Sequence, residues 1–525
     1  MSVRGISIDV IMKRRGFIKC VGHSLALPTV LSSFGLQSVS AKALRAFMSS
    51  AAEQGRVLVL VYMQGGNDGL NTIIPLDNLS VLKGLRPAVA LEDKDMLQLS
   101  KAPLAFHPSL SGFRSLYDEN RLVVVQNVGY PEQNFSHFRS TDIWITASDS
   151  NKIEDTGWMG RYLNETFEGY PEEYPNEEFQ DPLAIEFGSS STALFQGPNA
   201  AMSMVINNPD TFYDLLDEIE SPVPDTPAGE KLKYIRLIAK QSQQYGAVVK
   251  KAAELSGERA GYPNTNLGDQ LKIVARLIAG GLKTPIYRVQ LGSFDTHNDQ
   301  VDTDRKTGRH ADLLRQLNDA VVAFMSDLEK MGRGDDVVGM TYSEFGRRIA
   351  SNGSNGTDHG AAAPLFVFGN KVAGGVLGSN PILDASMDHR DNLTMQHDFR
   401  QVYASILDQW FGVDSIQMNA TMFKDFDTMP IISGAIASVK TERLPSLSVH
   451  PNPLNGQATI AFDSNAAMFT IDLVDIQGRL IERIHRGVGQ SGALLLSWDT
   501  SYLSGGRYFV VLQQKDNDQI FSVVK

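Results

Sequence analysis

The first 430 residues alternate between short runs of consecutive apolar residues and longer stretches with apolar residues three or four positions apart. The short runs are typical of strands buried on both faces of a parallel sheet, and the longer spacing is typical of helices. Strands are predicted at residues 57–63, 121–130, 285–297, 336–346 and 364–370. Helices are predicted at residues 134–148, 233–255, 266–282, 311–331 and 398–412. This alternation predicts an α/β domain over residues 56–430, in which a doubly wound parallel sheet carries helices on both faces.

From about Pro445 the helical spacing disappears, and short stretches of alternating apolar and polar residues take its place. Turn-forming residues recur between these stretches at short intervals, which is typical of a β-sandwich. Residues 445–525 are therefore predicted to form a small C-terminal all-β sandwich. Residues 431–444 are predicted to be the linker that joins it to the larger domain.

Residues 1–43 have the pattern of an export signal. A basic cluster precedes a moderately apolar stretch, and Ala41-Lys42-Ala43 has the small-residue pattern of a cleavage site. The run Arg14-Arg15-Gly16-Phe17-Ile18-Lys19 resembles the twin-arginine signal, which exports folded proteins. The alternative is an ordinary secretory peptide, and both Met1 and Met12 are candidate start positions.

Composition narrows the possible classes of function. The chain has 525 residues, of which 42% are apolar and 21% charged, as in soluble globular proteins. The net charge of −12 argues against nucleic-acid binding. No transmembrane segment is predicted in the mature chain. Because the single cysteine, Cys20, lies in the leader, the mature chain is predicted to have neither a disulfide nor a thiolate metal ligand.

Polar side chains that can bind metal ions recur where the predicted strands end. Carboxylates and imidazoles without thiols suit Zn, Mn, Fe, Mg or Ca rather than a soft metal. Asp68 lies in the glycine-rich segment 65–69 after the first strand, where an ordinary turn is the alternative interpretation. Ligands of open α/β sheets bind beyond the carboxyl ends of the strands, so several such residues together favour a site over separate turns. The candidates are Asp68, Ser136, His137, Asp295, His297, Glu344, Asp358 and His359.

Several motifs in combination resemble a known family. They are GGNDGLNTIIP, FHPSL, SHFRSTDIW, TGWMGRYL, SFDTHNDQ, TYSEFGRR, GTDHGAAAP and DFRQVYASILDQWFG, spread over residues 56–415. Their order is similar to that of the alkaline phosphatase superfamily, which includes sulfatases and phosphodiesterases. More closely, they resemble a bacterial family of exported sulfatase-like proteins labelled a domain of unknown function. The resemblance implies an alkaline-phosphatase-like fold and a metal-dependent hydrolase that acts on phosphate or sulfate esters.

The resemblance also implies the ligands of two divalent metal ions. Asp68 and Glu344 would hold the first ion, while Asp295, His297 and His359 would hold the second. Two such ions stabilise the attacking and leaving oxygens of a displacement at phosphorus or sulfur. The superfamily usually has Asp-His where this chain has Glu344-Phe345, so the first ion would lack an imidazole ligand.

The catalytic roles that the resemblance implies centre on Ser136. This residue is predicted to cap the helix at 134–148 and would be the nucleophile, at a helix N-terminus that favours an anionic ester substrate. Alternative nucleophiles are Thr72, Ser140 and Thr141. Groups that would neutralise the transferred anion are Arg139, His137 and Arg347. A non-catalytic surface binding or assembly protein that retains the fold is the alternative function.

The tail resembles the C-terminal sorting domain of type IX secretion substrates. The motifs that carry this resemblance are Pro451-Asn452-Pro453, the turn Asp475-x-x-Gly478-Arg479 and the ending Leu503-x-x-Gly506-x-Tyr508. The alternative, a carbohydrate-binding sandwich, lacks an apparent aromatic platform. The resemblance implies that the partners are the export and type IX secretion machinery. It also implies a protein that is in the periplasm in transit and then at the cell surface or outside the cell.

Overall fold

The computed structural model describes residues 55–206, 244–433 and 447–525, apart from residues 465–467, 476–478, 489–491 and 515–516 in the last range. The chain divides into two compact units, one ending at Ala435 and the other beginning at Ile436. The leader predicted for residues 1–43 lies outside the described residues, as does most of the linker predicted for residues 431–444.

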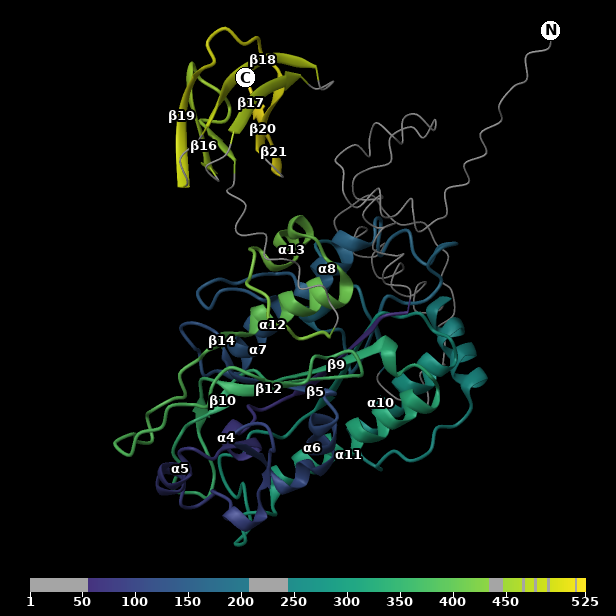
Figure 1. The fold of residues 1–525 in the computed structure, drawn as a ribbon. Helices are drawn as coiled ribbons and strands as arrows, with labels where there is room; N and C mark the ends of the chain where they lie inside the picture. Colours follow the sequence, from purple (N-terminus) through teal and green to yellow (C-terminus); the bar gives the residue numbers. More distant parts are fainter. Residues whose placement is uncertain are drawn as a thin grey trace, which may run out of the picture. The chain divides into compact units, whose positions relative to one another are not determined.

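A nine-stranded sheet forms the centre of the first unit (Figure 1). In spatial order its strands are β13 (Gly375–Leu377), β5 (Leu122–Gly129), β12 (Ala363–Phe368), β9 (Val337–Tyr342), β1 (Val57–Met63), β8 (Ile286–Leu291), β6 (Ala184–Phe187) and β7 (Met204–Ile206), with β14 (His397–Asp398) beside β5. Strands β1, β5 and β9 are buried along their whole length, as their continuous apolar runs predict.

Helices cover both faces of this sheet, which confirms the doubly wound α/β architecture (Figure 1). Alternate residues of β1 belong to two different core clusters, Val57 and Val59 to one and Leu58 and Leu60 to the other. One cluster contains α6 (Ser111–Asp118), α10 (Asn266–Ala279) and α11 (Arg309–Lys330). The other contains α7 (His137–Thr146), α8 (Trp158–Thr166), α12 (Phe399–Ile406) and α13 (Ser415–Met422).

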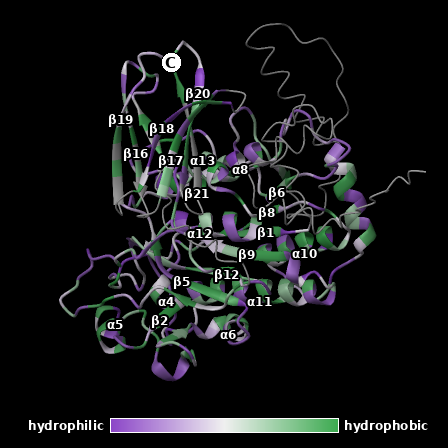
Figure 2. Ribbon diagram, turned by 45° about the horizontal axis from the view of Figure 1, so that its top comes forward, coloured by the Kyte–Doolittle hydropathy of each residue, from purple (hydrophilic) through white to green (hydrophobic). Residues whose placement is uncertain are grey.

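The helices are amphipathic, whereas the central strands are mainly hydrophobic (Figure 2). Part of the helix predicted at 233–255 lies outside the described residues, and residues 244–256 are helical. Within the described ranges, no helix is both long and apolar enough to cross a membrane.

The sheet is mainly parallel, as predicted, but strand β12 runs antiparallel to both of its neighbours. Phe368 pairs with Leu122 of β5 and with Gly339 of β9 in antiparallel register, while β1 pairs parallel with both β8 and β9. The residues that precede β12 therefore lie at the edge where β1, β8 and β9 end.

Smaller elements border the sheet. They are a three-stranded sheet of β2 (Ile73–Pro75), β4 (Leu104–Phe106) and β3 (Leu97–Gln98), a ribbon of β10 (Gly346–Arg347) and β11 (His359–Gly360), and the helices α4 (Gly69–Thr72) and α5 (Leu79–Leu85). Short 3-10 turns lie at Asp93–Asp95, Pro108–Leu110, Ala193–Phe195 and Gly334–Asp336, and a π-helical turn at Leu407–Phe411 follows α12.

The second unit is an all-β sandwich, as predicted. One sheet has β15 (Ser448–His450), β16 (Gln457–Ser464) and β19 (Gly492–Asp499). The other has β18 (Leu480–Val488), β17 (Met468–Asp475), β20 (Arg507–Gln514) and β21 (Asn517–Val524). Both sheets contribute to one core, in which Ile460 and Trp498 of the first sheet join Ile471 and Val510 of the second.

Candidate functional site

Four segments bring polar side chains to one edge of the large sheet. Asp295 and His297 follow β8, and Glu344 follows β9. His137 begins α7, the helix after β5, and His359 lies in β11, just before β12. Because β12 is antiparallel, a residue before it reaches the same edge as residues that follow the parallel strands.

Glycines after β1 allow these segments to approach closely. Gly65 has φ of 122°, and a Cβ atom there would lie 2.3 Å from the backbone nitrogen of Asp295. Gly66 has φ of 82°, and its Cβ would lie 2.4 Å from the ring of Phe345. Both the positive φ angles and the lack of space require glycine at these positions.

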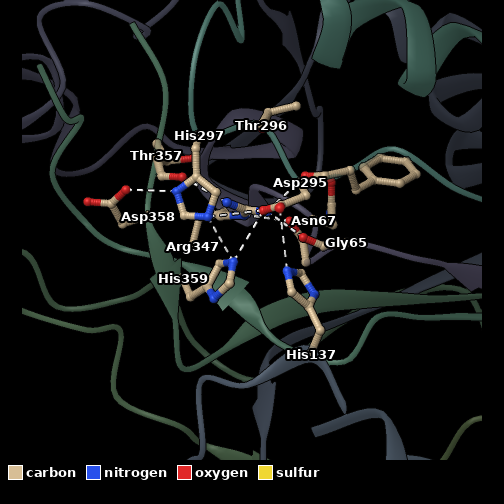
Figure 3. A network of polar contacts seen from close by, with 12 residues as sticks. Gly65, Asn67, His137, Asp295, Thr296, His297, Arg347, Thr357, Asp358 and His359 are labelled. Carbon is tan, nitrogen blue, oxygen red and sulfur yellow. Dashed lines mark hydrogen bonds and ion pairs between the residues drawn. The ribbon is translucent and has the colours of Figure 1, made fainter. Parts of the chain in front are cut away.

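Three imidazole rings surround the carboxylate of Asp295 (Figure 3). Its oxygens lie 3.1 Å from Nε2 of His297, 3.2 Å from Nε2 of His359 and 3.4 Å from Nε2 of His137. The Nε2 atoms of His297 and His359 are 2.9 Å apart. We call these four residues the inner group. His137, Asp295 and His359 offer ligand atoms that all lie within 4.8 Å of one another.

The outer nitrogen of each imidazole faces an oxygen that can only accept a hydrogen bond. His137 Nδ1 lies 2.8 Å from Glu344 Oε1, and His297 Nδ1 lies 2.9 Å from Asp358 Oδ1. His359 Nδ1 lies 2.8 Å from the backbone oxygen of Phe135. Each Nδ1 is therefore the donor, and in the neutral ring each Nε2 directs its lone pair toward the inner group.

The pKa values of the inner group follow from its neighbours. Burial alone would raise the pKa of Asp295, but the hydrogen bond from Arg347 and the imidazoles lower it to about 2. The hydrogen bond to Glu344 raises the pKa of His137, whereas burial lowers the pKa of His359. Asp295 is consequently an anion at neutral pH, with two-fifths of its side chain open to solvent (44%).

Within the inner group, His137, Asp295 and His359 have the donors and spacing of a candidate site for a divalent cation. In a tetrahedral site with bonds of about 2.0–2.1 Å, neighbouring ligand atoms lie roughly 3.3 Å apart. The three Nε2 atoms lie 3.1–3.4 Å from the Asp295 oxygens, and those of His297 and His359 lie 2.9 Å apart, which is close to this value. Without a cation or a proton between them, the lone pairs of two neutral imidazoles at 2.9 Å would repel each other.

Arg347 was expected to neutralise the transferred anion, but all three nitrogens of its guanidinium donate hydrogen bonds to other groups of the protein. It is buried, and its Nε donates to the carbonyl of Gly66 and its Nη1 to that of Thr357. Its Nη2 donates to the carbonyls of Gly65 and Phe294 and, at 2.7 Å, to Asp295. Arg347 thus fixes the loops after β1 and β8 in place.

Asp68 was predicted to bind metal, but the structure gives its carboxylate other partners. Arg86, just after α5, donates from Nη2 to both oxygens at 2.8 Å, and Gln300 donates to Oδ2. Asp68 and Arg86 are both buried, and the guanidinium, together with His310, keeps the pKa of Asp68 below its ordinary value although burial alone would raise it. Asp68 is therefore not part of the inner group.

The remaining predicted residues lie around the inner group or turn away from it. Glu344 lies behind His137 and accepts the backbone N–H of Gly65, so it orients an imidazole instead of joining the inner group. Ser136 occupies the N-cap position of α7, but its exposed side chain makes no capping hydrogen bond. Arg139 turns away, because its guanidinium binds Asp142 and the carbonyls of residues 149, 150 and 152.

Sequence reasoning missed the residues that act behind the inner group. Asp358 was noted beside His359, but its role as partner of His297 was not predicted. Arg86 lies in none of the motifs that carried the resemblance, and Gln300 ends the motif SFDTHNDQ but was not singled out. A buried charge such as Asp68 does require a partner, and that rule alone would have prompted a search for a buried arginine.

The sequence matches two family profiles. Residues 56–421 match a family described as "Protein of unknown function (DUF1501)", and residues 448–525 match the secretion system C-terminal sorting domain. The second match confirms the predicted type IX sorting tail, so the protein is secreted, to the cell surface or beyond it. None of the curated proteins matches the sequence.

Solved structures that match the chain share little sequence with it. Ps i-CgsB is 13% identical with a TM-score of 0.33, and the match covers 78% of this chain and 84% of that one. A protein of the alkaline phosphatase superfamily from Vibrio parahaemolyticus is 9% identical with a TM-score of 0.33, covering 92% and 88%. The phosphonate monoester hydrolase SpPMH from Silicibacter pomeroyi is 11% identical with a TM-score of 0.31, covering 90% and 89%.

Proposed function

The chain belongs to the DUF1501 family, and from that premise we propose that it is an exported metal-dependent hydrolase of phosphate or sulfate esters. The observation that carries the proposal is the convergence of three imidazole Nε2 atoms on Asp295, each with its Nδ1 held by an acceptor. Metal-binding histidines usually donate their second nitrogen to a carboxylate or a carbonyl in this way.

His137, His297, His359 and Asp295 would hold the ion. Their nitrogen and oxygen donors suit zinc or manganese, and a site of mainly carboxylate and water oxygens would be expected for magnesium or calcium. When bound, a divalent ion supplies Lewis-acid stabilisation of negative charge on the ester oxygens.

The protein's own groups would orient the substrate. The hydroxyl of Ser136 is exposed at the N-terminus of α7, between the Phe135 carbonyl and the His137 ring that both contact the site. The positive end of the helix dipole favours an anionic ester there. Ser136 is the proposed nucleophile.

A non-catalytic binding protein is the second candidate, and one observation favours it. The two residues expected to hold an ion beside Ser136 both have other partners, since Asp68 pairs with Arg86 and Glu344 orients His137. A single ion without the second would bind an anion but lack the paired stabilisation of the attacking and leaving oxygens.

Metal analysis of the purified mature chain, together with a panel of chromogenic phosphate and sulfate esters, tests the proposal. We expect bound divalent metal and hydrolysis of at least one ester that a chelator abolishes. His359→Ala should lower both metal content and thermal stability, because a ligand that binds only the folded state stabilises it by about 2.7 kcal/mol at one hundred times its Kd.

The exposed His389 provides a matched control, since His389→Ala also removes an imidazole from the same unit but not from the inner group. This variant should retain wild-type metal content. Bound metal without hydrolysis of any ester would favour the binding protein. An absence of bound metal in the wild type at saturating zinc or manganese would refute the metal-dependent hydrolase.

A further inference from the structure

The buried ion pair of Asp68 and Arg86 lies directly behind the inner group and is connected to it by one side chain, Gln300. The Gln300 amide nitrogen donates to Asp68 Oδ2. The amide oxygen accepts from the hydroxyl of Thr357 at 2.7 Å and from that of Thr296 at 3.0 Å. All five side chains are buried.

The two threonines belong to the two loops that carry most of the inner group. Thr296 lies between Asp295 and His297, and Thr357 is two residues before His359. The loops also touch directly, because the backbone nitrogen of Thr357 donates to the carbonyl of Thr296 at 3.2 Å. One amide oxygen therefore bonds to both loops, beside the backbone hydrogen bond that joins them.

We propose that Asp68 and Arg86 form a positioning device for the metal centre that acts through the Gln300 amide. This inference rests on the proposed metal site. The reason is that the amide has a donor nitrogen at one end and an acceptor oxygen at the other. A carboxylate can only accept, so Asp68 requires the amide nitrogen to face it, which turns the oxygen toward the two threonine hydroxyls. Arg86 keeps Asp68 charged in the buried environment and so preserves that orientation.

In this arrangement Asp68 does not bind the metal ion itself. It instead influences the positions of the residues that would bind the ion. No hydrogen bond or ion pair joins Asp68 to the inner group among the described residues, but its partner Gln300 bonds to Thr296 and Thr357 in the two loops. A loss of the amide would free the loops to change the distances among His297, His359 and Asp295 without removing any ligand.

The test compares zinc affinity, the visible spectrum of the cobalt-loaded protein and the stability of the metal-free protein. The variants are Gln300→Met and the milder Thr357→Val, both in the full mature chain. Thr284→Val is the matched control, because the Thr284 hydroxyl is equally buried and donates to the carbonyl of Pro182 at the other end of β8.

We expect Gln300→Met and Thr357→Val to bind zinc about 10- to 100-fold more weakly and to alter the cobalt spectrum, which reports ligand geometry. Thr284→Val should lose stability in the metal-free state but keep wild-type zinc affinity and the wild-type spectrum. If Gln300→Met fails to fold, Thr357→Val still decides the question.

Wild-type zinc affinity and an unchanged cobalt spectrum in the two variants would overturn the inference and leave the metal site intact. A wild-type protein that binds neither zinc nor cobalt would overturn the proposed function as well, so the two failures are distinct.

Discussion

At the scale of single residues, the pairing of Asp68 with Arg86 keeps the carboxylate after β1 out of the inner group. A buried charge is tolerated only when a partner compensates for its lost hydration. Arg86 is 0% exposed and Asp68 1%, so neither has water as a substitute partner at its surface. The pair therefore contributes little net stability by its presence but would cost much if broken.

Arg86→Met should accordingly destabilise the folded chain by about 3–5 kcal/mol, because it leaves Asp68 charged and uncompensated in the interior. Urea unfolding followed by tryptophan fluorescence measures this loss. The double variant Asp68→Asn/Arg86→Met should recover part of it, since both charges are then absent. Equal destabilisation in the single and double variants would show that packing, and not charge, determines the effect.

Two buried histidines near this pair predict a dependence of stability on pH. Burial lowers the pKa of His310 to about 4 and that of His107 to about 3, and the charges that face His310 are Asp68, Arg86 and Arg347. The unfolded chain, with histidine pKa values near 6.5, binds more protons than the folded chain as the pH falls below that value. Stability should therefore fall between pH 6.5 and about 4.

His310→Gln tests this effect, because glutamine can still donate to the Asn67 side chain that His310 Nε2 contacts at 3.0 Å. Protonation of this histidine lowers the free energy of unfolding by on the order of 3 kcal/mol over that pH range. The variant should lose less stability than the wild type between pH 6.5 and 4 in urea titrations. Parallel pH profiles for the two proteins would mean that the acid sensitivity arises elsewhere.

At the scale of strands and helices, apolar patterns predicted which elements exist better than how they are joined. Strands β1, β5 and β9 have continuous apolar runs and were predicted within about two residues at their starts. The short strands β6 and β7 were missed, since four and three residues are too few to show a period. The antiparallel direction of β12 was also missed, because hydrophobic periodicity carries no information about strand direction.

The same limit applies to the site: residues next to a strand in the sequence could be predicted, whereas partners distant in the sequence could not. The edge of the sheet was predictable, because chemistry-bearing residues follow β1, β8 and β9 in the sequence. The partners were not, since Arg86 and Asp68 are 18 positions apart and Asp68 and Gln300 are 232 positions apart. Only the packing of α5 and of the loop after β8 brings those side chains to one carboxylate.

At the scale of the whole molecule, the two units have separate cores. The large unit is built on clusters drawn from residues up to Ile432, and the tail has its own cluster that begins at Leu447. Each core is formed by buried aliphatic and aromatic side chains of that unit's own sheets. A sorting tail of this kind can be removed without opening the larger core.

Deletion of residues 445–525 should thus leave the large unit folded and able to bind metal. The truncated chain should remain in the periplasm, because the sorting tail directs the protein to the surface. Cell fractionation with immunoblotting locates the truncated chain, and thermal unfolding with metal analysis shows whether the large unit keeps the midpoint and metal content of the full chain. A carbohydrate-binding tail predicts a different result, namely normal surface delivery with weaker retention on an insoluble polysaccharide. Surface display of the truncated chain would rule out sorting as the role of the tail. A folded, metal-bound chain confined to the periplasm would show that the tail determines localisation and that the large unit binds metal without it.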